Sequence, residues 1–267
     1  MTNINSISGN TKVYAIIADP IHHVKTPAAM NDLFSARGED GVLVPFHVAP
    51  EDLPTVVAGL RGIQSLEGFI VTVPHKTTIV DLCDSVTEAA RVVGAVNVVT
   101  RTKAGKLHGD ILDGAGFVAG LRQAGIEPKG LSAYLAGAGG AANAIAFALA
   151  EAGVKRLTIA NRTAKKAQDL VERIAASFPA VELSVGTSDP SDHDLVVNGT
   201  SLGLRPGDAL PCDASKLTSN QIVAEIIMQP AITPLLAAAK EVGCRVHQGL
   251  PMLLCQIELM AAVMASK

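Results

Sequence analysis

The sequence predicts an α/β protein of two domains, with C-terminal helices that return to the first domain. Apolar runs of strand length alternate with helical patterns over the first hundred residues, and a second series of this kind begins after Gly130. Strands that alternate with helices indicate parallel pairing, with helices on the faces of the sheet. The length of 267 residues is enough for two modest domains, each with its own core.

Composition and charge exclude several classes of protein. With 48% hydrophobic and 18% charged residues, the chain has the composition of a globular protein rather than a disordered one. A formal net charge of −3, no Trp and two Tyr argue against a nucleic-acid surface. The N-terminus is polar and no apolar run approaches the length of a bilayer span. We therefore expect a cytoplasmic protein with no nucleic-acid or membrane partner.

The cysteines give no sign of a metal site or a disulfide framework. They stand alone in the sequence, with no CxxC pair and no His at metal-ligand spacing. Separate buried thiols are the expectation, and no metal is predicted. The four positions are Cys83, Cys212, Cys244 and Cys255.

The first domain is expected to contain three strands and two helices. Thr26 supplies a hydroxyl at the N-cap of the first helix, Pro27 takes the first helical position, and Gly38 follows the end. The turn Asp19-Pro20 ends the first strand. We predict strands at residues 13–18, 41–48 and 69–74, and a second helix at residues 51–61.

The second domain begins with a strand at residues 131–135, followed at once by a glycine-rich turn and an Ala-rich helix. A β-α-β series with a glycine loop at its first turn is typical of a Rossmann-type domain. Further strands are predicted at residues 156–160, 182–185, 194–198 and 222–226, a helix at 165–178, and two helices within 233–265 that are broken around 243–251. The predicted boundaries are 1–103 for the first domain, 104–235 for the Rossmann-type domain and 236–267 for the C-terminal helices.

The glycine loop predicts dinucleotide binding. Gly137, Gly139 and Ala142 match GxGxxA between a strand and a helix. The first glycine permits the tight turn, the second lets the backbone approach a pyrophosphate, and the helix N-terminus favours an anion. The alternative is a tight structural turn without a ligand. The predicted cofactor-binding residues of this loop are Gly137, Ala138, Gly139, Gly140 and Ala141.

The end of the second strand of this domain favours NADP over NAD without deciding between them. A carboxylate there would bind the ribose hydroxyls of NAD, but Asn161, Arg162 and Thr163 occupy the position. Arg162 can pair with a 2′-phosphate. The alternative is a solvated arginine, and the sequence offers no second arginine for a bidentate clamp.

A lysine follows the last predicted strand of the first domain. Lys76 ends the segment FIVTVPHK, at the edge where open α/β sheets bind ligands. An ammonium group that is partly removed from water can exchange a proton near neutral pH. Asp110 and Asp113 in GDILDG are the candidate partners. The alternative is a surface lysine after a proline turn.

Seven short motifs in register along the chain resemble the shikimate dehydrogenase family. They are VTVPHK at 71–76, GAVN at 94–97, GDILDG at 109–114, GAGGAA at 137–142, NRT at 161–163, NGTSLG at 198–203 and QGLPMLLCQ at 248–256. The resemblance implies an NAD(P)-dependent oxidoreductase that interconverts a cyclic hydroxy acid, shikimate or quinate, and its keto form.

The same resemblance implies roles for individual residues. Lys76 would be the acid-base group at the reacting hydroxyl, with Asp113 as its paired carboxylate. Thr26, Thr72, Asn97 and Gln256 would bind the substrate. Asn198, Thr200 and Ser201 would lie beside the cofactor, with Gly249 and Met252 near the nicotinamide.

The differences from the family pattern concentrate in the substrate site. The family has a Ser-x-Ser where this chain has Val24-Lys25-Thr26, and it has polar or aromatic residues at four further positions: Ile70, Ile111, Leu112 and Met228. Each lost hydrogen bond costs about 0.5–1.5 kcal/mol. Either the substrate is less hydroxylated than shikimate, or shikimate is a poor substrate. The basic residues His22, His23 and Lys25 replace the lost carboxylate contact, or they are solvated loop residues.

Two rival functions remain. One is a dinucleotide-binding sensor without turnover, which has no need of the Lys76 and Asp113 pair. The other is an enzyme similar to methylene-tetrahydrofolate dehydrogenase, which the GDILDG and QGLPML segments disfavour. The assembly state is open, with a homodimer as one candidate.

Overall fold

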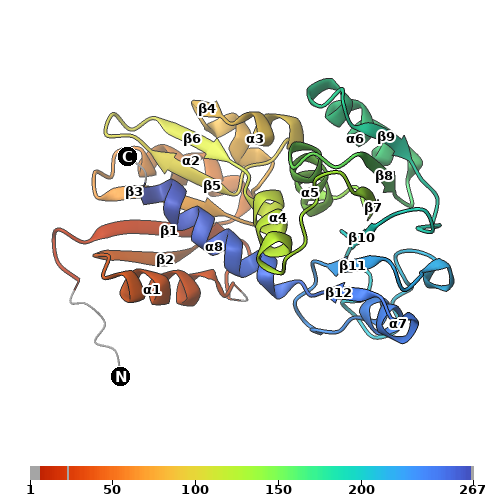
Figure 1. The fold of residues 1–267 in the computed structure, drawn as a ribbon. Coiled ribbons are helices and arrows are strands. Elements are labelled where there is room, and N and C mark those ends of the chain that lie inside the picture. Colours follow the sequence, from red (N-terminus) through yellow and green to blue (C-terminus); the bar gives the residue numbers. More distant parts are fainter. Residues whose placement is uncertain (1–6, 23, 266–267) are drawn as a thin grey trace. The chain divides into compact units, whose positions relative to one another are not determined.

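The computed structural model describes residues 7–22 and 24–265, and it contains two compact units (Figure 1). The first unit is Met1–Leu112 together with Ile257–Lys267, and the second unit is Asp113–Gln256. Each unit is built on one six-stranded sheet. The predicted two-domain α/β fold is therefore confirmed.

The sheet of the first unit is mixed, with the strand order β2-β1-β3-β5-β6-β4. β1 pairs in parallel with β2 and β3, whereas β5 pairs antiparallel with both β3 and β6. The predicted parallel pairing is confirmed for the three predicted strands β1, β2 and β3. The antiparallel pairs come from β5 and β6, which were not predicted and form a hairpin whose turn contains Gly105 at φ 77°. The strands are β1 Lys12–Ala18, β2 Gly41–His47, β3 Leu66–Val71, β4 Ser85–Val86, β5 Val98–Arg101 and β6 Leu107–Asp110.

The first helix corrects the predicted cap. Helix α1 begins at Thr26 itself, so Lys25 occupies the N-cap, and no side chain caps this end. Gly38, in the left-handed conformation at φ 67°, ends the helix as predicted. The other helices that lie wholly in this unit are η1 Pro50–Asp52, α2 Leu53–Leu60, η2 Thr78–Leu82 and α3 Glu88–Val93.

The sheet of the second unit confirms the predicted Rossmann-type domain. Its order is β12-β11-β10-β7-β8-β9, and every neighbouring pair is parallel. Numbered within the unit, this is the 3-2-1-4-5-6 order of doubly wound nucleotide-binding folds. The strands are β7 Ser132–Ala136, β8 Arg156–Ala160, β9 Glu182–Val185, β10 Leu195–Asn198, β11 Ile222–Glu225 and β12 Arg245–His247.

Glycines on α4 let the helices of the second unit pack closely. A Cβ at Gly114 would lie 2.0 Å from the Ala144 carbonyl oxygen, and one at Gly116 would lie 2.8 Å from Cβ of Gln256. Any larger residue would push these helices apart. The helices are α4 Asp113–Gln123, α5 Gly140–Glu151, α6 Ala164–Ser177, η3 Ala214–Lys216 and α7 Pro234–Val242, with α8 Leu250–Ala265 beginning in this unit and ending in the first.

The unit boundaries lie at 112/113 and 256/257, not at the predicted 103/104 and 235/236. Residues 107–110 stay in the first unit because β6 pairs with β5. Residues 245–247 stay in the second because β12 pairs with β11. Of the C-terminal helices, only the end of α8 belongs to the first unit, where Met264 lies against Gly68.

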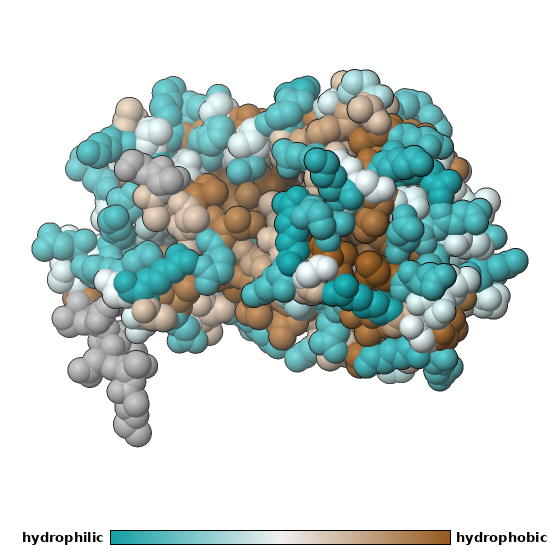
Figure 2. Space-filling view, in the orientation of Figure 1, coloured by the Kyte–Doolittle hydropathy of each residue, from teal (hydrophilic) through white to brown (hydrophobic). Residues whose placement is uncertain are grey.

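Each unit has its own apolar core. In the first, Ile16, Phe34 and Phe69 are fully buried, and in the second, Tyr134 and Val196 belong to one buried cluster. On the face drawn in Figure 2, hydrophilic residues cover much of the surface between smaller apolar areas. Across residues 7–22 and 24–265, the structure contains no helix that is long and apolar enough to span a bilayer.

Candidate functional site

The glycine loop between β7 and α5 has the geometry of a phosphate site. Gly137 sits at φ 113°, and a Cβ there would lie 3.0 Å from the Gly199 carbonyl oxygen, so both conformation and space demand glycine. A Cβ at Gly139 or Gly140 would meet nothing within 4 Å. Packing within the protein therefore does not explain these two glycines, and they leave open space at the N-terminus of the twelve-residue helix α5.

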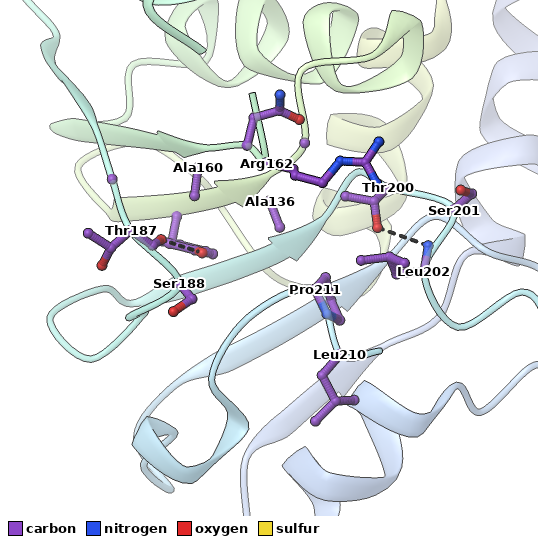
Figure 3. A pocket seen from close by; sticks show the side chains of 14 residues that line it. Ala136, Ala160, Arg162, Thr187, Ser188, Thr200, Ser201, Leu202, Leu210 and Pro211 are labelled. Carbon is purple, nitrogen blue, oxygen red and sulfur yellow. Dashed lines mark hydrogen bonds between the residues drawn. The ribbon is translucent and has the colours of Figure 1, made fainter. Parts of the chain in front are cut away.

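A pocket of about 480 Å³ lies beside this loop, and its walls come from the carboxyl ends of β7, β8, β9 and β10 (Figure 3). Ligands of doubly wound sheets bind at this edge, where the strand order reverses between β7 and β10. The lining residues are Tyr134, Ala136, Gly137, Ala160, Asn161, Arg162, Gly186, Thr187, Ser188, Thr200, Ser201, Leu202, Leu210 and Pro211.

Five predicted cofactor residues line this pocket: Gly137, Asn161, Arg162, Thr200 and Ser201. Of the other loop residues, Ala138 follows Gly137 in the turn, Gly139 is the N-cap of α5, and Gly140 and Ala141 are the first two residues of that helix. Thr163 does not line the pocket, but its carbonyl accepts a hydrogen bond of 2.9 Å from Asn161 Nδ2.

The sequence analysis missed the pocket wall that follows β9. Thr187 and Ser188 come directly after this strand, and the buried Tyr134 donates a hydrogen bond of 2.9 Å to the Thr187 carbonyl. Burial raises the pKa of Tyr134, so its hydroxyl remains a donor. The rule that ligands bind at carboxyl ends of parallel strands would have identified this segment, because β9 was placed correctly.

The wall after β8 suits a phosphate rather than two ribose hydroxyls. Arg162 is exposed, and none of the residues that line the pocket is Asp or Glu. A free guanidinium without a competing carboxylate can pair with a 2′-phosphate. The residues present thus fit a dinucleotide, and the place of its pyrophosphate at residues 137–141 stays a prediction.

Asn198 serves the loop that lines the pocket rather than the pocket itself. It is fully buried, and its Oδ1 accepts hydrogen bonds from the Thr200 N–H at 3.0 Å and the Thr200 hydroxyl at 2.7 Å. The Leu202 N–H in turn donates to the Thr200 hydroxyl at 3.0 Å (Figure 3). Asn198 therefore fixes the shape of the segment that presents Thr200 and Ser201.

Gly249 and Met252 do not line this pocket. A Cβ at Gly249 would lie 2.5 Å from the Ile227 carbonyl oxygen, so the backbone after β12 can rest on the backbone after β11 only if this residue is glycine. Met252 is half-buried in the first turn of α8, and its carbonyl lies close to Gly116 of α4. Their predicted place near the nicotinamide stays a prediction.

In the first unit, backbone hydrogen bonds bring three predicted residues together. The Val71 N–H donates to the Asn97 carbonyl at 2.9 Å, and the Val96 N–H donates to the Lys76 carbonyl at 2.8 Å. These bonds hold residues 71–76, which include Thr72, against residues 96–97. Lys76 and Thr72 are half-buried, whereas Asn97 is fully buried.

Side chains also hold this segment in place. The buried His75 ring donates from Nε2 to the Val48 carbonyl at 2.9 Å, which anchors the turn before Lys76. Asn97 Oδ1 accepts a hydrogen bond of 2.9 Å from the Leu112 N–H. Part of the polar capacity of Asn97 is thus used by the protein itself.

Asp113 and Gln256, two predicted residues 143 positions apart, meet in the second unit. Gln256 Nε2 donates a hydrogen bond to Asp113 Oδ1, and both side chains are buried. Asp113 is the first residue of α4, where the helix dipole favours a carboxylate. Lys76 belongs to the first unit, so its pairing with Asp113 stays a prediction.

Residues that differ from the family pattern divide into two groups. Ile70, Ile111 and Leu112 are buried. Val24 and the predicted substrate residue Thr26 are half-buried and lie at the start of α1, and Thr26 is free of the cap role that would have competed with substrate binding.

The other positions at which this chain differs from the family pattern, and the neighbouring basic residues, are exposed or lie outside the described residues. His22 and Lys25 are exposed, Met228 is exposed, and His23 lies outside the described residues. Within the described part of the chain, no three His, Cys, Asp or Glu side chains gather as metal ligands would.

Comparison with protein-family models assigns both units. Residues 16–99 match the shikimate dehydrogenase substrate binding domain, and residues 122–202 match the shikimate / quinate 5-dehydrogenase model. The shikimate dehydrogenase (NADP(+)) of Lysinibacillus sphaericus is 40% identical over 247 residues, which cover 92% of this chain and 89% of that protein.

Solved structures agree with these matches. The shikimate 5-dehydrogenase of Listeria monocytogenes, in complex with shikimate and NAD, superposes with a TM-score of 0.92 at 33% identity and covers 98% of this chain and 94% of its own. The 5-ketofructose reductase of a Gluconobacter strain has a TM-score of 0.89 at 32% identity, covering 97% and 95%. These matches favour neither rival function and confirm the predicted enzyme class, an NAD(P)-dependent oxidoreductase. The chain belongs to the shikimate dehydrogenase family.

Proposed function

We propose that this protein is a shikimate dehydrogenase that uses NADP and interconverts shikimate and 3-dehydroshikimate. The observation that carries the proposal is the convergence of Thr72, Lys76 and Asn97 in the first unit, held by the backbone bonds between residues 71–76 and 96–97. The pocket of the second unit supports it, since Arg162 lines the pocket without an acidic neighbour in its wall.

The second unit would hold the cofactor. Residues 137–141 would bind the pyrophosphate with backbone N–H groups, and Arg162 would bind the 2′-phosphate. Thr200 and Ser201 would contact the cofactor from the pocket wall that follows β10. When bound, the nicotinamide accepts a hydride from the carbinol carbon or returns one to the ketone. The protein contributes position and the exclusion of water from the reacting atoms.

The proton is handled by residues of this chain. In the oxidation direction Lys76 Nζ takes the proton of the reacting hydroxyl, and in the reduction direction it returns that proton to the ketone oxygen. Asp113 would orient the ammonium group, and Gln256, which donates to Asp113 Oδ1, would fix the direction of the carboxylate. Thr26, Thr72 and Asn97 would bind the hydroxyl and carboxylate groups of the substrate.

A cyclic hydroxy acid with fewer hydroxyls than shikimate is the second candidate substrate. Val24, at the start of α1, has no hydroxyl with which to bind a carboxylate or a ring hydroxyl. The likeness to a 5-ketofructose reductase supports a substrate other than shikimate, because that neighbour of similar fold is named for a different carbonyl substrate.

The test is initial-rate oxidation of shikimate, quinate and less hydroxylated cyclic acids, each with NADP and with NAD, followed at the nicotinamide absorbance. The proposal expects the highest kcat/KM for shikimate with NADP. Higher kcat/KM for a less hydroxylated acid would replace the substrate, and cofactor binding without turnover of any acid would favour a sensor.

We extend the proposal to a homodimer in the cytoplasm. The chain carries a net charge of −3, which suits a protein in aqueous solution. Light scattering of the purified protein gives its mass in solution, and a mass of one chain would contradict the dimer. Fractionation of the source cells, with recovery in the membrane or secreted fraction, would contradict the location.

A further inference from the structure

A buried carboxylate with no part in the proposed chemistry lies behind the loop that lines the cofactor pocket. Glu225 is the last residue of β11, and its side chain is fully buried. Asn198 Nδ2 donates to its two carboxylate oxygens at 3.1 and 3.0 Å, and the Thr233 hydroxyl donates to it at 2.9 Å. The N–H groups of Ile226 and Ile227 donate to it at 2.8 and 3.0 Å.

Among the described residues, the groups that hydrogen-bond to Glu225 are all donors, which suits an acceptor-only carboxylate. Burial raises the pKa of Glu225, and the hydrogen bonds from Asn198, Ile227, Thr233 and Ile226 act in the opposite direction. A glutamine in this place would keep the size but would bring an NH₂ group against at least one of the donors.

One branch of this network reaches the pocket wall. Asn198, held by Glu225 through Nδ2, uses Oδ1 to accept both hydrogen bonds from Thr200. Asn198 Nδ2 also donates to the Leu202 carbonyl at 3.0 Å. The segment 200–202, which lines the pocket, is therefore tied at both ends to one amide whose orientation Glu225 sets.

A second branch reaches the segment before α8. Glu225 fixes the N–H groups of Ile226 and Ile227, and the backbone of these two residues is the surface on which Gly249 rests. A third branch goes to Thr233, whose hydroxyl also caps α7 by accepting from the Leu236 N–H at 3.3 Å. One carboxylate thus joins the loops that follow β10 and β11 and the start of α7.

We propose that Glu225 is a positioning residue for the nicotinamide half of the cofactor. It touches no part of the pocket itself, and it acts by holding residues 198–202 and the Ile227–Gly249 contact in one geometry. The inference rests on the proposed function of this pocket as the dinucleotide site. Among the described residues, neither the glycine loop nor Arg162, which would hold the adenosine half, forms a hydrogen bond with Glu225, whereas Gly249, which is predicted to lie near the nicotinamide, rests on the two residues that Glu225 holds, so the effect is expected on the nicotinamide half.

The test compares Glu225→Gln with the wild type in two equilibrium titrations, one with NADPH followed by nicotinamide fluorescence and one with adenosine 2′,5′-bisphosphate followed by calorimetry. We expect the variant to bind NADPH about tenfold or more weakly and adenosine 2′,5′-bisphosphate within about twofold of the wild type. If Glu225 merely supported the fold, the substitution would weaken the binding of both ligands by the same factor.

Asp194→Asn is the matched control. Asp194 directly precedes β10, at the opposite end of this strand from Asn198, and accepts two hydrogen bonds of 2.7 Å from Ser132. The control therefore makes the same change of carboxylate to amide at the other end of the same strand. We expect this variant to lose thermal stability and to keep both affinities. If Glu225→Gln is insoluble, Thr233→Val removes one donor and is expected to shift NADPH affinity in the same direction by a smaller factor.

Unchanged NADPH affinity in the soluble variant would overturn the proposal, as would equal weakening of both ligands. Both titrations proceed without substrate. Failure of the wild type to oxidise shikimate would therefore contradict the proposed function alone and leave this test decisive.

Discussion

The second unit builds its site largely from backbone, whereas the first unit builds its site from side chains. In the second unit, Gly137 and Gly139 provide a turn and an open approach, and a change of sequence elsewhere in the pocket leaves this intact. In the first unit, the proposed recognition of the substrate would depend on side chains such as those of Thr26, Thr72 and Asn97. The differences of this chain from the family pattern concentrate in this unit, at Val24, Ile70, Ile111 and Leu112, whereas the glycine loop of the second unit keeps the pattern.

The largest effect is expected for Lys76→Ala. Removal of the proton carrier should lower kcat by about a thousandfold, the usual size of general acid-base catalysis, while NADPH affinity stays close to that of the wild type. Steady-state kinetics and fluorescence titration measure the two quantities. Lys106→Ala, which removes an exposed lysine that pairs with Asp84 in the same unit, is the control. Retained turnover in Lys76→Ala would break the assignment of chemistry to this unit.

Gly139→Ala tests the backbone-built site. A Cβ at this position meets no protein atom within 4 Å, so the melting temperature should not fall, whereas the added methyl group should obstruct the pyrophosphate and weaken NADPH binding about tenfold. Gly59→Ala in α2, equally free of contacts, is the control and should leave binding unchanged. Normal NADPH affinity in Gly139→Ala would show that the loop is only a structural turn.

Arg162→Ala tests the side chain on which the proposed choice of NADP depends. Loss of a hydrogen bond to a charged phosphate, worth about 1.5–3 kcal/mol, should raise the KM for NADP tenfold or more and leave the KM for NAD unchanged. Lys165→Ala removes a neighbouring positive charge that pairs with Asp169 at 2.8 Å. This control measures how much the loss of any positive charge near the pocket weakens cofactor binding. Equal loss with both cofactors would refute a 2′-phosphate contact.

Val24→Ser tests the substrate site at the start of α1. A restored hydroxyl should lower the KM for shikimate by a factor of about 2–10, in line with one neutral hydrogen bond. Val24→Ala shortens the side chain without adding a hydroxyl and should not reproduce the gain. If both variants give the same KM for shikimate, the missing hydroxyl at position 24 does not explain the substrate preference.

The smallest effect concerns pH. Burial, with a smaller contribution from Arg245, lowers the pKa of His247, whose Nε2 has no hydrogen-bond partner among the described residues. Protonation then favours the unfolded chain, so the free energy of unfolding should fall as pH drops below about 6.5, the ordinary value. Denaturant titrations between neutral pH and pH 5 should show a shallower decline for His247→Leu, and an identical decline would contradict this cause.

The predictable parts of the fold were those with strong local signals. The strands predicted at 156–160 and 182–185 coincide with β8 and β9, and Gly38 marks the end of α1. β4, β5, β6 and β12 were missed, because strands of two to four residues that include polar side chains show little apolar period. The pairing of β6 with β5 and of β12 with β11 places residues 107–110 in the first unit and 245–247 in the second, which differs from the predicted boundaries.

The candidate site was predictable where backbone geometry dictates the residue type. Gly137 is required by its φ angle, and its spacing from Gly139 is visible in the sequence. Asn198 was assigned to the cofactor, whereas the structure turns its side chain inward to Glu225 and Thr200, a contact between segments 27 residues apart that no local pattern reveals. Thr187 was missed although it lies just beyond the carboxyl end of the predicted strand β9, where the hydrogen bond from the buried Tyr134 to its carbonyl holds it.

The most direct measurement is the rate of NADPH oxidation by the wild-type protein with 3-dehydroshikimate as the sole acceptor, followed at the nicotinamide absorbance. The account predicts saturable turnover that consumes one NADPH for each ketone reduced, with shikimate as the product and a much lower rate with NADH. Binding of NADPH without its consumption would contradict it.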